Sequence, residues 1–166
     1  MSEPVKESTD SKQNQQQFAL QKIYVKDLSF ETPKSPAVFT EEWKPDVNIE
    51  LDTKGKQIAE NVHEVVLGVT VTVKVGDSTA YLAEIHQAGI FTIKGFPESE
   101  LGAMLGSYCP NVLFPYAREV ISDLVTKGGF PQFLLAPVNF DAVYREHLQK
   151  MQQSSVNTDV DKEAVH

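Results

Sequence analysis

The sequence predicts an α+β fold, because strand-like segments fill the first part of the folded region and helix-like segments fill the second. The chain has 166 residues, the length of a single domain. Hydrophobic residues make up 41% of it and charged residues 23%, which is a globular composition. We therefore expect one folded domain at 18–151, with disordered polar tails at 1–17 and 152–166 that have little to bury.

The first predicted strand, 18–30, has apolar residues in both of its alternating sets. Such a strand is apolar on both faces, and we expect it to be either central in the sheet or part of an interface. The segment 32–45 contains three prolines and is expected to be a loop, since proline lacks the amide hydrogen that a sheet needs. Because this long loop also carries Trp43, a functional role is expected for it.

Three further strands are predicted from alternating apolar residues at 47–52, 62–75 and 78–94. The last two are separated by Gly76-Asp77, a two-residue turn that favours a hairpin. Polar residues on the second face of the strand 47–52 favour an antiparallel sheet. The strand 78–94 is partly apolar on both faces. We expect the chain's own helices to cover one face of the sheet and a second subunit to cover the other.

Helical signals follow the strands. Pro97 and the acidic residues after it mark the start of a short helix. The main helix is predicted at 111–127, where apolar residues recur every three or four positions and Pro115 falls in the first turn. A last helix is expected to begin at Asn139, a residue that caps helices well, and to extend to about Met151.

Composition and motifs argue against several classes of function. The 23 acidic and 15 basic residues give a net charge of −8 without a basic cluster, so direct binding to nucleic acid is not expected. The sequence contains no phosphate-binding glycine loop, no nucleophile elbow and no metal-binding histidine spacing. The single cysteine, Cys109, lies in an apolar setting and is expected to be a small buried hydrophobe. We therefore expect no enzymatic activity, no cofactor and no metal.

The location of the protein is also predicted from what the sequence lacks. No apolar run approaches the length that spans a bilayer, and the polar N-terminus has no apolar signal segment. One cysteine cannot form an intrachain disulfide, as expected in a reducing compartment. A soluble, cytoplasmic protein is expected.

Two segments of the second half, Tyr108–Glu119 (YCPNVLFPYARE) and Leu135–Ala142 (LAPVNFDA), resemble the bacterial protein-export chaperone family SecB. Ile23–Glu31 (IYVKDLSFE) is similar to the first strand of that family, and Gly89–Phe91 (GIF) to its fourth. The resemblance covers roughly 18–151 in order.

This resemblance implies a four-stranded antiparallel sheet with a long helix and a C-terminal helix packed on it. It also implies a homotetramer that is a dimer of dimers, in which the long helices lie between the sheets. Such an arrangement would account for the broad apolar stripe of the helix 111–127. The residues then expected at or near subunit contacts are Ala83, Ile85, Gln87, Leu113, Tyr116, Val120 and Leu124.

The resemblance further implies an ATP-independent chaperone that holds unfolded precursor proteins and delivers them to the SecA motor of the Sec translocase. The residues expected to line apolar grooves for the unfolded chain are Tyr24, Trp43, Val47, Ile49, Leu51, Tyr144 and Leu148. An acidic face for SecA is expected at Asp27, Glu31, Leu82 and Glu84. Any metal is expected to belong to the zinc-bearing tail of SecA and not to this chain.

Two other functions remain open. One is a small α+β binding module with an apolar pocket for a lipid or another small ligand, which a closed cavity and a co-purifying ligand would reveal. The other is an enzyme that uses Cys109 or a histidine. Rapid alkylation of the thiol at neutral pH would favour it, because catalytic thiols have a depressed pKa.

Overall fold

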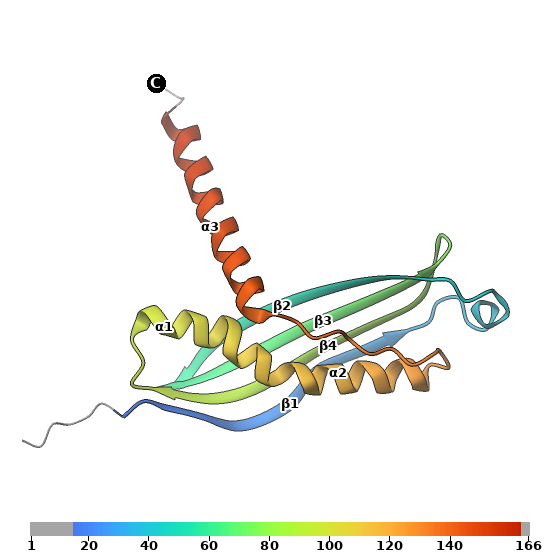
Figure 1. Ribbon diagram of the computed structural model, residues 1–166, viewed down its shortest axis with the longest axis horizontal. Helices are drawn as coiled ribbons and strands as arrows, with labels where there is room; N and C mark the ends of the chain where they lie inside the picture. The colour runs from blue at the N-terminus through green and yellow to red at the C-terminus, as the bar shows by residue number, and fades with distance from the viewer. Residues whose placement is uncertain (1–14, 164–166) are drawn as a thin grey trace, which may run out of the picture.

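A four-stranded antiparallel sheet occupies the first part of the chain, and helices follow it (Figure 1). The computed structural model describes residues 15–163. The strands are β1 (Gln17–Glu31), β2 (Pro45–Ala59), β3 (Val62–Val75) and β4 (Ser78–Lys94). The helical elements are the 3-10 turn η1 (Ala37–Thr40), α1 (Glu98–Ala103), the π-helical turn η2 (Met104–Tyr108), α2 (Cys109–Lys127) and α3 (Phe140–Glu163). The predicted α+β class and antiparallel sheet are confirmed.

The strands lie side by side in the order β1-β4-β3-β2. The turn between β3 and β4 is the predicted one, and its Gly76 has a φ of +61°, a conformation that costs little without a Cβ atom. β1 pairs with β4 and forms one edge of the sheet. The segment 18–30 is therefore an edge strand, and a central position for it is wrong.

Two β-bulges in β1 explain why its sequence has apolar residues in both alternating sets. The register of β1 against β4 shifts between Leu20 and Lys22, and again between Val25 and Asp27. Each extra residue reverses the side to which the following side chains point. The apolar side chains that consequently share one side of the sheet are Phe18, Leu20, Ile23, Val25, Leu28 and Phe30.

Helix α2 lies across one side of the sheet, over β4 and β3 (Figure 1). We name this side the helix face and the opposite side the open face. Val69 and Ile85, which point to the helix face, are fully buried. Their neighbours Thr70 and Glu84 point to the open face and are partly exposed. This alternation is typical of a sheet that helices cover on one side, and a second subunit over the open face stays a prediction.

The long helix α2 begins at Cys109, two residues before the predicted start. Pro115 consequently lies inside the helix and not in its first turn, so one backbone hydrogen bond is lost there. α1, η2 and α2 follow one another directly, and the helical backbone continues through Gly102 and Gly106. The helix ends at Lys127, as predicted from the glycines that follow.

Helix α3 begins as predicted, because the side chain of Asn139 accepts a hydrogen bond from the amide of Ala142 at 3.1 Å. The helix continues to Glu163, beyond the predicted end near Met151, so much of the predicted C-terminal tail is helical. Its first turns pack on η2, and the rest projects away from the sheet (Figure 1). Most of the predicted N-terminal tail lies outside the described residues. None of the described helices is sufficiently long and apolar to cross a membrane.

Candidate functional site

The helix face is only partly covered, because α2 packs over the two inner strands. On β2 the side chains of Val47 and Ile49 are 40% and 44% exposed, although both point to the helix face. Leu51 continues this row and is half-buried. We name Val47, Ile49 and Leu51 the β2 strip. A contiguous row of exposed apolar side chains marks a surface for a partner.

A second exposed apolar row lies at the opposite edge of the same face. It consists of Leu20, Val25 and Leu28, which we name the β1 strip, and each of them is more than two-fifths exposed. Tyr116, on α2, is also half exposed. The helix face therefore has an uncovered apolar margin along each outer strand.

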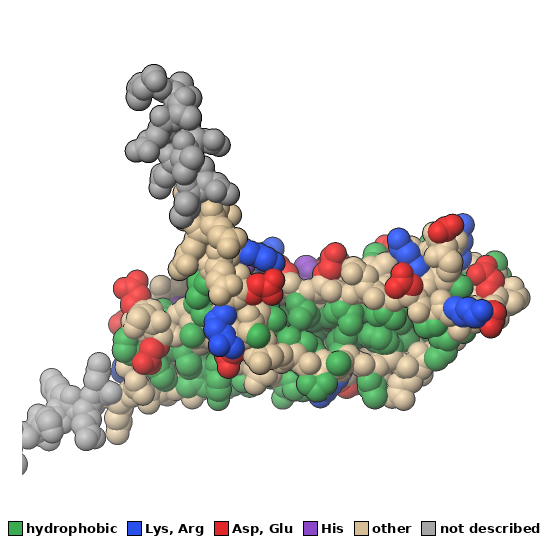
Figure 2. All heavy atoms as spheres, turned by 45° about the horizontal axis from the view of Figure 1, so that its top comes forward, with side chains coloured by type: hydrophobic (Ala, Val, Ile, Leu, Met, Phe, Trp, Pro, Cys, Tyr) green, Lys and Arg blue, Asp and Glu red, His purple; other side chains and the backbone are tan. Residues whose placement is uncertain are grey.

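A cavity of about 310 Å³ lies between β2 and the base of α3. It begins where the β2 strip ends, since Leu51 lines it together with Leu105, Phe140, Tyr144 and His147. Figure 2 shows hydrophobic side chains in a band along the molecule from the base of α3. The cavity and the strip thus form one mostly apolar surface, which can take an extended chain with bulky apolar side chains.

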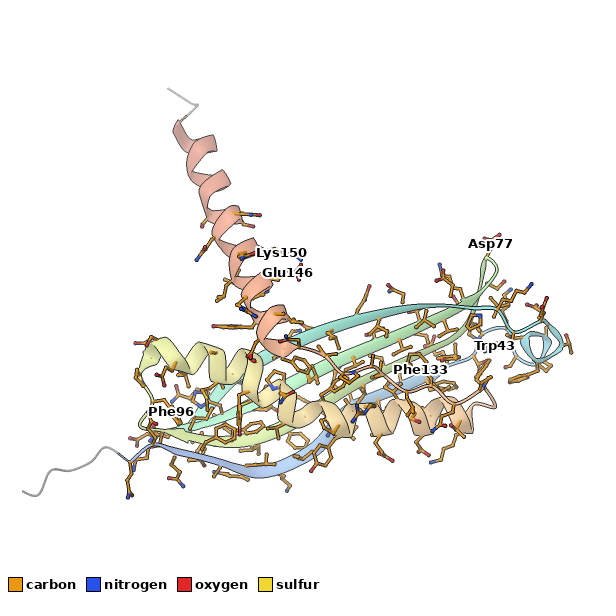
Figure 3. All side chains as sticks on the ribbon, in the orientation of Figure 1. Trp43, Asp77, Phe96, Phe133, Glu146 and Lys150 are labelled. Atoms are coloured by element: carbon orange, nitrogen blue, oxygen red, sulfur yellow. The ribbon has the colours of Figure 1, made fainter. Side chains whose placement is uncertain are left out.

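Trp43 anchors the connection between β1 and β2 to the core. Its ring centroid lies 5.6 Å from that of Phe130, and Phe130 in turn lies 4.8 Å from the buried Tyr81. Phe39 of η1 packs on the same ring at 5.2 Å. Trp43 lies at the end of the sheet away from α3 (Figure 3). The predicted proline-rich loop is therefore fixed by aromatic packing, and Trp43 is half-buried.

The structure brings some of the predicted groove residues together and separates others. Leu51 and Tyr144 line one cavity, whereas Val47 and Ile49 lie in the row that extends from it along β2. Leu148 follows Tyr144 by about one turn of α3 and is 39% exposed. Tyr24 is separate from all of these, because it pairs with Ala88 and points to the open face. A single groove that includes Tyr24 is therefore not formed within this chain.

Tyr24 instead takes part in a hydrogen-bonded network on the open face. Its hydroxyl donates to Glu64, and the ammonium group of Lys26 lies 2.9 Å from the same carboxylate. The hydrogen bond to Glu64 raises the pKa of Tyr24 to about 12, and the two donors hold the pKa of Glu64 below its ordinary value. Because Glu64 belongs to β3, the network ties the edge strand to the sheet across β4.

The predicted SecA-binding residues do form one patch on the open face. In the pairing of β1 with β4, Ser29 lies opposite Glu84 and Glu31 opposite Leu82, while Asp27 is one pair further along. All of these side chains point away from α2. We name Asp27, Glu31, Leu82 and Glu84 the acidic patch. The structure therefore unites residues that are more than fifty positions apart in the sequence.

The residues predicted at or near subunit contacts fall into two groups. Ala83, Ile85, Gln87 and Leu113 are buried between the sheet and α2, so another subunit cannot touch them directly in this arrangement. A substitution at one of these residues could change assembly only indirectly, by shifting α2 relative to the sheet. Tyr116, Val120 and Leu124 of α2 are exposed or half-buried. Contacts between subunits at these positions stay a prediction.

Cys109 is fully buried at the start of α2, as expected for a small buried hydrophobe. Burial raises the pKa of its thiol to about 12. A nucleophilic thiol needs the opposite shift, because the thiolate is the reactive form. The structure therefore gives no support to an enzyme that uses Cys109.

Sequence reasoning missed one group of side chains on the open face. Asp27, Glu84 and His86 each offer a donor atom, and these atoms lie within 4.8 Å of one another. The spacing of Glu84 and His86 on one strand could have indicated a shared face. The approach of Asp27 depends on the bulge in β1, which the sequence does not reveal.

Comparison with known proteins identifies the relatives of the chain. Residues 11–151 match the family described as preprotein translocase subunit SecB. A protein-export protein SecB of Nitrosococcus oceani is 62% identical over 157 residues, which cover 93% of this chain and 96% of that protein. Its counterpart in Methylococcus capsulatus is 62% identical over 148 residues, or 89% of this chain and 96% of that protein.

Among solved structures, a SecB-like chaperone of Mycobacterium tuberculosis shares the fold, with a TM-score of 0.61. That protein was solved in complex with a peptide from an antitoxin. It is 16% identical in sequence, and the match covers 73% of this chain and 90% of that one.

Proposed function

This chain belongs to the SecB family of protein-export chaperones, and from that premise we propose that it holds unfolded precursor proteins without ATP and delivers them to the SecA motor. The observation that carries the proposal is the β2 strip leading into the cavity at the base of α3. This surface is apolar, open and elongated, so it suits an extended client segment.

The spacing of the β2 strip fits such a client. Successive side chains on one side of an extended chain lie about 7 Å apart, and the members of the strip have the same spacing because they occupy every second position of a strand. Burial of apolar surface yields roughly 25 cal/mol per Å² and depends little on sequence. A folded client has already buried its apolar side chains, so this surface selects unfolded chains.

Tight binding requires several such contacts at once. A short apolar strip alone gives weak binding, since association costs translational and conformational freedom. A long unfolded client that engages several strips of one assembly gains effective concentration at each additional contact. We therefore propose a homotetramer, with the β1 strip and the exposed side of α2 as the surfaces available for assembly.

We further propose that the acidic patch receives SecA, as the family resemblance implies. Asp27 and Glu31 are exposed on the open face, so they do not compete with clients bound at the β2 strip. Carboxylates at an exposed face attract a basic partner segment over a distance of about 10 Å at 0.1 M salt. Client and motor would then bind on opposite sides of one sheet.

Two measurements test this function. Capture of a slow-folding secretory precursor is compared between its unfolded and native forms, and only the unfolded form should be retained. Equal capture of both forms would contradict selection by exposed apolar surface. Native mass spectrometry of the protein, alone and with the unfolded precursor, should give a tetramer that takes up client. A monomer at micromolar concentration would contradict the assembly.

A further inference from the structure

Three potential metal ligands converge on the open face. They are carboxylate oxygens of Asp27 and Glu84 and an imidazole nitrogen of His86, and they lie within 4.8 Å of one another. Glu84 Oε1 and His86 Nε2 lie 3.1 Å apart. All three side chains are at least partly exposed, so an ion and its water ligands could reach them.

The backbone holds these side chains together. Glu84 and His86 are two positions apart on β4, and they therefore point to the same side. Asp27 lies directly opposite His86 in the register with β1. Because Val25 pairs with Gln87, an unbroken register would place Asp27 opposite Ile85, on the helix face. The β-bulge between Val25 and Asp27 turns this carboxylate to the open face.

The next strand packs a glycine against the imidazole. Gly68 of β3 pairs with His86, and a Cβ atom added at Gly68 would lie 3.5 Å from His86 Cδ2. Gly68 is buried, and the same atom would lie 3.6 Å from Asp52 Cβ of β2, so the ring is held in contact on this side. Water molecules can complete the coordination sphere of an ion from the exposed side of the cluster, which is the usual arrangement when a protein supplies three ligands.

We propose that Asp27, Glu84 and His86 bind a divalent transition-metal ion, with Zn²⁺ as the probe of choice. One imidazole and two carboxylates suit Zn²⁺, Co²⁺ or Ni²⁺ better than Mg²⁺ or Ca²⁺, which prefer oxygen alone. Donors at roughly 2.0–2.2 Å around a tetrahedral ion are about 3.3 Å apart. Glu84 and His86 already have this spacing, and the exposed side chain of Asp27 can rotate inward. This site goes beyond the proposed chaperone function.

Isothermal titration calorimetry of the full chain tests the site with ZnCl₂ in a buffer that does not chelate metals. One Zn²⁺ per chain should bind, and MgCl₂ should bind far more weakly. His86→Gln and Asp27→Asn should each weaken Zn²⁺ binding by about 10- to 100-fold or more, since loss of a ligand costs at least as much as loss of its supporting contacts. His86→Cys should retain binding, because a thiolate is also a good zinc ligand.

The matched control is Glu50→Gln. Glu50 lies on β2 and points to the open face, so this change removes one negative charge from that face without removing a donor of the cluster. It should leave Zn²⁺ affinity unchanged. Unchanged affinity in His86→Gln, equal affinity for Mg²⁺, or absence of Zn²⁺ binding by the wild type would each overturn the proposal. The titration uses the protein alone, so its failure is distinct from a failure of client or SecA binding.

Discussion

The aromatic ring of Tyr144 in α3 occupies the space left by the missing side chain of Gly106 in the π-helical turn. A Cβ atom added at Gly106 would lie 2.5 Å from Tyr144 Cδ2, closer than two carbon atoms can approach. Gly102, one turn earlier, is similarly close to the Tyr144 hydroxyl. The contact fixes the base of α3, and with it one wall of the cavity at the end of the β2 strip.

Gly106→Ala should therefore loosen α3 and destabilise the protein by about 1–3 kcal/mol, the usual cost of forcing an extra methyl group into a packed contact. Urea unfolding and hydrogen exchange along α3 measure the effect. Gly55→Ala is the matched control, because a Cβ atom there would meet Leu105 at an ordinary 3.7 Å. Equal stability of the two variants would contradict the role of the glycine contact.

A polar substitution in the β2 strip should weaken client binding without unfolding the protein. Ile49→Ser removes an apolar side chain that is 44% exposed, so the loss should appear mainly in affinity for an unfolded precursor. A several-fold weaker affinity is expected, and fluorescence anisotropy with a labelled precursor segment measures it. Asn48→Ser, on the opposite face of the same strand, should bind like the wild type. A similar loss in both variants would contradict the assignment of the strip.

Reversal of charge in the acidic patch should weaken SecA binding and leave client binding intact. Glu31→Lys places a positive charge at an exposed position where a basic partner segment is expected to bind. Affinity for SecA at low salt should fall several-fold, and the difference from wild type should shrink as salt screens the charges. Glu50→Lys makes the same change on β2 of the open face and should have a smaller effect. Unchanged affinity in Glu31→Lys at low salt would remove the assignment.

Stability should fall in mildly acidic solution because of His63. This residue is buried on the helix face, its Nδ1 atom has no hydrogen-bond partner, and desolvation lowers its pKa. The unfolded chain therefore takes up a proton more readily than the folded one as the pH falls below about 6.5, so unfolding becomes easier. Urea unfolding from pH 7.5 to pH 5 should show this loss.

Two variants test whether His63 causes this pH dependence of stability. His63→Phe removes the titrating group from the core and should reduce the loss of stability at low pH. His147→Gln removes an exposed histidine and should keep the wild-type pH dependence. A wild-type slope in His63→Phe would show that other groups cause the acid sensitivity.

The strands were predictable from sequence because alternation directly reports a sheet with one covered face. β3 and β4 alternate over most of their length, with one register shift between Val73 and Lys74, and their predicted bounds agree with the structure. β1 was only partly predictable, since each bulge depends on pairing with β4 and has no local sequence signal. Simple alternation therefore predicts apolar residues on both faces of this strand, whereas the bulges place them on one face.

For the candidate surfaces too, the sequence alone does not reveal which residues of different strands lie together. The residues of the acidic patch lie together on the open face because of the register of β1 with β4, which the sequence of either strand alone does not reveal. Their role in binding SecA stays a prediction. The sequence places Tyr24 with the apolar groove, but the position of its side chain depends on the bulge between Leu20 and Lys22 and on the hydrogen bond to Glu64. The extension of α3 to Glu163 was missed, because the polar composition of 152–163 does not distinguish a projecting helix from a tail.

The two bulges leave Gln21 and Lys26 of β1 without a partner residue in the register with β4. Lys26 lies at the second bulge, so exchanging it for another polar residue preserves the geometry on either side. Deleting it would instead make the ladder continuous, with Asp27 still opposite His86 and Phe30 still opposite Ala83. An edge strand built in this way can lose an unpaired residue and keep both of its surfaces, whereas a residue lost from a paired stretch would change the side to which its neighbours point.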